Sequence, residues 1–168
     1  KMLGGPQSGI ILSSNEIVNL IKSNSIYRTV RCDKITIALL DDIIRSFEKN
    51  GFLKTNLSLE LLTQSRKDLM ITANYIVDKI PSKFIDELGI KIIESMVEAG
   101  SGSLPEKNIR SIALKFKPSK YSVNHVSDHF RRSPKPIIGY IRKESYFIDL
   151  KAVLPHQKDN IVGAIKSI

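Results

Sequence analysis

Residues 1–11 read KMLGGPQSGII, which places a lysine three residues before a Gly-Gly-Pro turn. A lysine that forms a Schiff base needs a lowered pKa, and it needs a backbone that lets cofactor and substrate approach closely, as glycine does. Lys1, Gly4 and Gly5 are therefore candidate residues of a cofactor site. Lysines near glycines are common, so an ordinary lysine beside a turn remains the alternative. The chain opens on this turn without an initiator Met, and we expect a piece of a longer protein.

The residues that follow this turn have mainly helical spacing up to about residue 80. A short apolar run indicates a buried strand, and Ser or Asp residues precede stretches with apolar positions three and four apart, as helix caps do. The expected elements are a strand at 10–12 and helices at 14–23, 33–51, 57–64 and 67–80. The apolar stripe of the last helix comprises Leu69, Ala73, Ile76 and Ile80, and Pro81 stops it.

From about Phe84 onward the pattern changes to short β-rich runs. The expected elements are strands at 91–97, 109–116, 136–141 and 146–150 and helices at 122–132 and 155–168. This order predicts an α+β layer, with a mainly antiparallel sheet and helices on one face. Glu144 and Ser145 are expected to form a tight hairpin turn. We therefore divide the chain into residues 1–80 and residues 81–168.

The composition is that of a globular protein with a basic surface. Hydrophobic residues make up 42% and charged residues 26% of the 168 residues, which is enough for a buried core. Lys and Arg number 26 against 17 acidic residues, so the formal net charge is +9 and the isoelectric point is near 9.7. Such a charge favours polyanionic partners, either RNA or phosphorylated ligands.

The cysteine count and the apolar runs indicate a cytoplasmic protein. A single cysteine, Cys32, excludes an internal disulfide framework and fits a reducing compartment. No apolar run approaches membrane-spanning length, and the start lacks the apolar core of a signal peptide. We expect no membrane partner.

Arg28 and Arg31 lie three residues apart, just before the helix that Asp33 is expected to cap. Two guanidinium groups at this spacing can hold one tetrahedral oxyanion, and the amides at the start of the helix would add donors. The pair is therefore a candidate oxyanion site. Two solvated side chains on a surface loop are the alternative.

Other polar residues give weaker signals. His125 and His129 are one helical turn apart, but no second ligand pair and no accompanying Glu complete a metal-binding pattern, so we expect no metal site. The pair Arg131–Arg132 closes the expected helix 122–132, where cations suit the helix dipole as well as they would suit a tRNA contact. Cys32 has no catalytic partner in the sequence.

Several of these segments, in order, resemble bacterial selenocysteine synthase, the L-seryl-tRNA(Sec) selenium transferase family. Residues 1–11 resemble its Lys-Leu-Leu-Gly-Gly-Pro-Gln-Ala-Gly segment, whose lysine holds pyridoxal phosphate (PLP). Residues 27–34 resemble its Arg-Ala-Leu-Arg-Val-Asp-Lys segment, and this double-arginine segment separates the family from PLP lyases that share the first motif. Later segments at 102–105, 136–141 and 148–150 also match. The departures remove no charge and no glycine; they are Met2, Ser8, Thr29, Val30 and Cys32.

The resemblance implies a fold and a reaction. The fold class is α/β, a fold type I PLP-dependent transferase like aspartate aminotransferase, with residues 1–80 ending the large domain and 81–168 forming an α+β small domain. The implied reaction converts seryl-tRNA(Sec) to selenocysteinyl-tRNA(Sec) through aminoacrylyl-tRNA, using PLP and selenophosphate.

The resemblance also assigns roles to residues. Lys1 binds the cofactor, beside Gly4 and Gly5, while Arg28 and Arg31 hold selenophosphate or the phosphate released. The family forms a ring of dimers, a decamer, so the arginines can act across a subunit boundary. Residues that stack on the pyridine ring are absent from this chain, and we expect the chain alone to be inactive.

Two other functions fit the residues. Another PLP-dependent eliminase or lyase of the same superfamily would consume a small phosphorylated amino acid and not seryl-tRNA. A non-catalytic basic module would bind tRNA with a steep salt dependence and show no cofactor absorbance.

Overall fold

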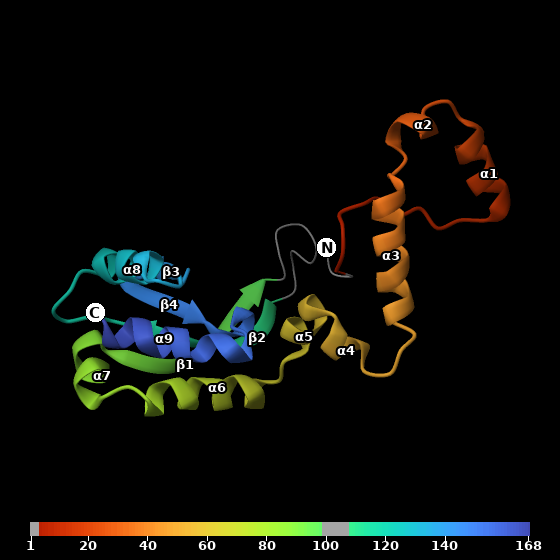
Figure 1. The fold of residues 1–168 in the computed structure, drawn as a ribbon. Coiled ribbons are helices and arrows are strands. Elements are labelled where there is room, and N and C mark those ends of the chain that lie inside the picture. The colour runs from red at the N-terminus through yellow and green to blue at the C-terminus, as the bar shows by residue number, and fades with distance from the viewer. Residues whose placement is uncertain (1–3, 99–107) are drawn as a thin grey trace. The chain divides into compact units, whose positions relative to one another are not determined.

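The computed structural model describes residues 4–98 and 108–168 (Figure 1). The chain divides into two compact units, one reaching to Glu60 and one spanning Leu61–Ile168. Lys1 and the turn at 102–105 lie outside the described residues, so the expectations placed on them stay predictions.

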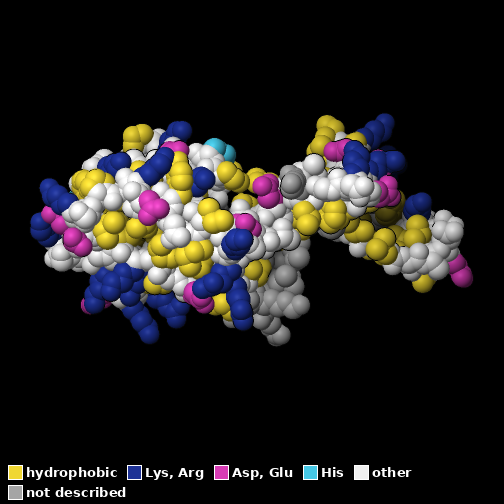
Figure 2. Space-filling view, turned by 90° about the horizontal axis from the view of Figure 1, so that it is seen from below, with side chains coloured by type: hydrophobic (Ala, Val, Ile, Leu, Met, Phe, Trp, Pro, Cys, Tyr) yellow, Lys and Arg dark blue, Asp and Glu magenta, His cyan; other side chains and the backbone are white. Residues whose placement is uncertain are grey.

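The first unit is a series of helices, of which the sequence predicts those at 14–23, 33–51 and 57–64 but not the two short helices at 27–30 and 52–55. Its elements are α1 (Asn15–Ser23), α2 (Tyr27–Val30), α3 (Lys34–Ser46), α4 (Phe52–Thr55) and α5 (Leu57–Thr63), the last of which crosses the boundary between the units. Ser14 caps α1, since its side chain accepts a hydrogen bond from the amide of Ile17. No described side chain of this unit is buried, and Figure 2 shows apolar side chains on its surface.

Two predictions for the first unit are wrong. Residues 10–12 form no strand, because no strand of the described residues pairs with them, and their side chains are 51–91% exposed. The helix predicted to end at Gly51 ends at Ser46 instead, where the Ser46 hydroxyl donates to the carbonyl of Ile43 at 2.6 Å. Gly51 does take the left-handed conformation, with φ 85°, but it precedes α4.

The second unit contains the predicted sheet. Its four strands, β1 (Ile90–Glu98), β2 (Asn108–Phe116), β3 (Tyr140–Arg142) and β4 (Ser145–Asp149), lie in the order β1-β2-β4-β3, and every neighbouring pair is antiparallel. Three helices pack against one face: α6 (Arg66–Asp78), α8 (Val123–Arg132) and α9 (Lys158–Lys166). The antiparallel α+β layer is therefore confirmed.

The core lies between this face and the helices. The predicted stripe on α6 is buried over its whole length, from Leu69 to Ile80. It meets the alternate residues of β2, among which Phe116 stacks edge-on against Phe130 of α8 at 5.3 Å between ring centroids. Ser65 and Asp68 close a capping box at the start of α6, which fixes the helix at its N-terminus.

Sequence patterns misplaced three features of this unit. A helix, α7 (Ser82–Leu88), stands between Pro81 and Gly89, where we expected β-rich texture. Strand β3 begins only at Tyr140, because residues 134 and 136 are prolines without an amide to donate. The hairpin turn is centred on Lys143 and Glu144, both with positive φ, as a two-residue turn of primed type requires.

The compact units do not use residue 80 as their boundary, since α6 packs with the sheet in Leu61–Ile168. The division into a cofactor domain and a small domain near residue 80 stays a prediction about the complete protein.

Candidate functional site

Gly4 and Gly5 form a tight turn that is packed against α3. Both have left-handed backbones, with φ 81° and 78°. A Cβ atom on Gly4 would lie 2.8 Å from Nδ2 of Asn56, and one on Gly5 would lie 2.4 Å from Cδ1 of Ile43. Only glycine combines this conformation with so close a contact. The turn thereby fixes the direction of the backbone directly after residues 1–3.

A pocket of about 400 Å³ opens beside this turn. Its walls carry hydroxyl, amide and charged groups from α3 and the residues that follow it, namely Asp42, Ser46, Lys49, Thr55, Asn56 and Ser58. Two of the hydroxyls are engaged within the chain, because Ser46 donates to Ile43 O and Thr55 donates to Phe52 O. The charged groups of this pocket are those of Asp42 and Lys49.

Arg28 and Arg31 lie at the end of the short helix α2. Arg28 is within α2, and Arg31 is its C-cap, with its amide donating to Tyr27 O at 3.0 Å. Both side chains are exposed, and neither forms an ion pair or a hydrogen bond with another described residue. The two guanidinium groups are therefore free to bind an anion.

The start of α3 is capped by an ionised side chain. Asp33 caps α3 as predicted, and its carboxylate accepts from the amides of Ile35 and Thr36 at 2.8 and 2.9 Å. These hydrogen bonds, those from Thr36 first, hold the pKa of Asp33 below its usual value. Asp33 therefore occupies two of the amides at the start of α3, and the sharing of an oxyanion between helix amides and the arginines stays a prediction. An anion here depends on the arginines.

The histidines have structural contacts in place of a metal-like arrangement. Nε2 of His129 lies 2.9 Å from the carbonyl of Ala164 and joins α8 to α9. His125 stacks on Tyr121 at 5.3 Å between ring centroids. No group of three or more His, Cys, Asp or Glu side chains within the described ranges is arranged to hold a metal ion.

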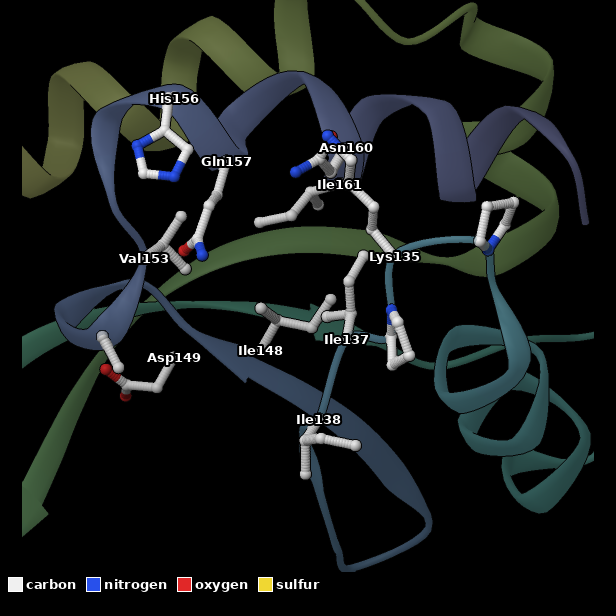
Figure 3. A pocket seen from close by; sticks show the side chains of 13 residues that line it. Lys135, Ile137, Ile138, Ile148, Asp149, Val153, His156, Gln157, Asn160 and Ile161 are labelled. Carbon is white, nitrogen blue, oxygen red and sulfur yellow. The ribbon is translucent and has the colours of Figure 1, made fainter.

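Sequence reasoning missed a pocket of about 450 Å³ in the second unit (Figure 3). Its floor is apolar, with Ile137, Ile148 and Ile161, and its rim carries His156 and Asn160. The lining comes from five separate segments between residues 134 and 161, so no local motif indicates it. Nothing among its contacts points to a particular ligand.

Fold and site together define a basic α/β chain with two exposed arginines, three residues apart, that have no ion-pair partner among the described residues. The family model of SelA, L-seryl-tRNA selenium transferase, matches residues 1–154. The chain therefore belongs to this family.

Curated relatives agree over the whole chain. An L-seryl-tRNA(Sec) selenium transferase of Desulfotalea psychrophila is 30% identical over 169 residues, covering 100% of this chain and 35% of the relative. Proteins of the same name from Escherichia coli O45:K1 and Shigella boydii serotype 18 are each 31% identical over 162 residues, covering 94% of this chain and 35% of their own length. The chain thus spans about a third of the length of these relatives. No described helix is long and apolar enough to cross a membrane.

Proposed function

We propose that the complete protein converts seryl-tRNA(Sec) to selenocysteinyl-tRNA(Sec), with PLP as cofactor and selenophosphate as selenium donor. The observation that carries this proposal is the family match over residues 1–154, which includes both the lysine segment and the double-arginine segment. A transferase acting on tRNA also accounts for the net charge of +9.

In this proposal Lys1 holds the cofactor through its side-chain amine. The arrangement at Gly4 and Gly5 fits such a role, because the turn is anchored to α3 and fixes the backbone that follows Lys1. PLP, when bound, supplies the electron sink for removing the α-proton of the seryl group and for expelling its hydroxyl. The chain contributes the amine and the rigid turn behind it.

Arg28 and Arg31 bind the selenophosphate in this proposal. Their side chains are exposed and have no carboxylate partner within the described part of the chain, so ligand binding breaks no existing ion pair. Two planar guanidinium groups three residues apart can hold a tetrahedral oxyanion through paired hydrogen bonds, and they also stabilise the phosphate that leaves. The two arginines orient the selenium donor, while the cofactor activates the seryl group.

The proposal is tested by replacing Lys1→Ala in the complete enzyme, with Lys22→Ala as control, since Lys22 is an exposed lysine of α1. We expect Lys1→Ala to lose the visible absorbance of a PLP Schiff base and the transfer of labelled selenium to seryl-tRNA. Lys22→Ala should retain both. Unchanged absorbance in Lys1→Ala would refute the assignment of the lysine, and a wild-type enzyme that consumes only small phosphorylated amino acids would refute the substrate.

A further inference from the structure

The sheet of the second unit has a face opposite to its helices. Residues alternate between the two faces, and the core residues Ile90, Ile112, Leu114, Tyr146 and Ile148 mark the helix side. The intervening residues form the opposite face, which we call the open face. Its centre is buried at Ser111, Ala113, Ser145 and Phe147, whereas Lys91, Tyr140 and Arg142 are exposed. Its members are Lys91, Ile93, Ser95 and Val97 on β1, Ile109, Ser111, Ala113 and Lys115 on β2, Ser145, Phe147 and Asp149 on β4, and Tyr140 and Arg142 on β3.

Three cations lie on the open face without an acidic partner. Lys91 is directly opposite Lys115 in the register of β1 and β2, and Arg142 is opposite Ser145 at the other edge. None of the three forms an ion pair within residues 4–98 and 108–168. Like charges directly opposite each other destabilise a sheet, so this pairing calls for a partner that neutralises it.

The one carboxylate of the described open face is already satisfied. Asp149 accepts hydrogen bonds from the hydroxyls of Ser95 and Ser111 at 2.7 and 2.5 Å, and from the amide of Lys151 at 3.1 Å. These hydrogen bonds hold the carboxylate in place, and its single negative charge is outnumbered by the three cations. The net character of the open face is therefore positive.

An aromatic pair lies among the cations. The rings of Tyr140 and Phe147 stack with 5.2 Å between centroids and 12° between planes. Phe147 is 9% exposed, whereas Tyr140 is 41% exposed and forms the outer ring of the stack. Arg142 follows on the same strand and face, so a flat aromatic surface and a guanidinium group are adjacent.

We propose that the open face binds unpaired nucleotides of the tRNA substrate. Lys91, Lys115 and Arg142 contact backbone phosphates, and a base stacks on the exposed ring of Tyr140. Basic groups around a sheet-borne aromatic ring are what single-stranded RNA requires, because phosphates and base faces are present in every sequence. Charge complementarity favours this polyanion over a protein partner. The inference rests on the proposed function, which supplies seryl-tRNA as the ligand.

The test measures tRNA affinity of the complete enzyme as a function of salt concentration. The variant combines Lys91→Gln, Lys115→Gln and Arg142→Gln. Its matched control combines Lys83→Gln, Lys166→Gln and Arg110→Gln, which removes the same charges from exposed positions on α7, on α9 and on the helix side of β2. Each lost phosphate contact lowers the salt slope of log affinity by about 0.7, so the first variant should lose about 2 units of slope. The control variant should lose much less than one unit of this salt slope.

Substitutions of Tyr140 give a second, independent test of the proposal. Tyr140→Phe keeps the ring and should bind tRNA like the wild type, whereas Tyr140→Ala should weaken binding about tenfold or more. Equal salt slopes for the two triple variants, or equal binding by Tyr140→Phe and Tyr140→Ala, would overturn the proposal. A triple variant that loses thermal stability or assembly but keeps the wild-type slope would identify the open face as a protein contact and also overturn it. A wild-type enzyme that binds no tRNA would refute the proposed function itself.

Discussion

Alanine substitution of Arg28 and of Arg31, one at a time, isolates the oxyanion role from general electrostatics. Both side chains are exposed and have no described ion-pair partner, so their loss leaves no orphaned carboxylate. Unfolding free energy should therefore change by about 0.5 kcal/mol at most. A charged hydrogen-bonding contact to the ligand is worth about 1.5–3 kcal/mol, which corresponds to a roughly ten- to hundredfold weaker use of selenophosphate.

The geometry at the start of α3 supports the upper part of this ten- to hundredfold range. The amides of Ile35 and Thr36 are occupied by Asp33, so they cannot replace a lost guanidinium group. Lysine at either position keeps the charge but loses the paired donors, and it should rescue activity only in part. PLP absorbance should remain at the wild-type level in all these variants.

The assay follows turnover of the complete enzyme against selenophosphate concentration, with tRNA affinity measured in parallel. Arg45→Ala is a suitable arginine control, because the Arg45 guanidinium is bound to Asp41 at 2.8 Å and is not free for a ligand. Its selenophosphate dependence should equal that of the wild type. If Arg28→Ala and Arg31→Ala kept normal selenophosphate dependence and lost only tRNA affinity, the oxyanion role would be wrong and the pair would belong to a polyanion surface.

Two further predictions concern the stability of the second unit. Gly139→Ala should lower the free energy of unfolding by about 3 kcal/mol, since its Cβ would lie 2.2 Å from the carbonyl oxygen of Phe147. Gly163→Ala, with no atom within 4 Å of its Cβ, is the control and should be neutral or stabilising in the same denaturant titration. Lys151 is 7% exposed, and its burial lowers its pKa below 10.5. The unfolded chain then binds the Lys151 proton more tightly than the folded chain, so the free energy of unfolding should rise with pH between the lowered pKa and 10.5. Urea titrations across this pH range should show a smaller rise for Lys151→Met than for the wild type. An equal rise in both proteins would contradict the prediction.

Regular spacing made the longer helices of this chain predictable, whereas the short helices α2, α4 and α7 were not predicted. The stripe from Leu69 to Ile80 repeats every three or four residues and ends at a proline, so its period and its stop signal agree, and the structure buries all four of its apolar residues. The cap residues Ser14 and Asp33 were likewise identified from type and position alone.

Features that depend on partners could not be predicted in the same way. Residues 10–12 have strand-like composition, but a strand exists only where another strand pairs with it. The turn at Lys143 and Glu144 uses positive φ without glycine or asparagine, so it lacks the usual sequence signal. At the candidate site, the spacing of Arg28 and Arg31 and the capping of α3 by Asp33 were predictable from the sequence, whereas the lack of an ion-pair partner for either arginine among the described residues was not.

The two units differ in how their sites can be held in place. In Leu61–Ile168 the sheet and three helices share a core, so the strands that carry the open face are fixed by buried contacts. Arg28 and Arg31 lie in the unit where no described side chain is buried and where short helices expose apolar residues such as Val30 and Ile35 at 70% and 73%. Helices of this length are marginal without tertiary packing. The arginines therefore acquire a fixed geometry only through contacts beyond residues 4–60, and their role has to be measured in the complete enzyme.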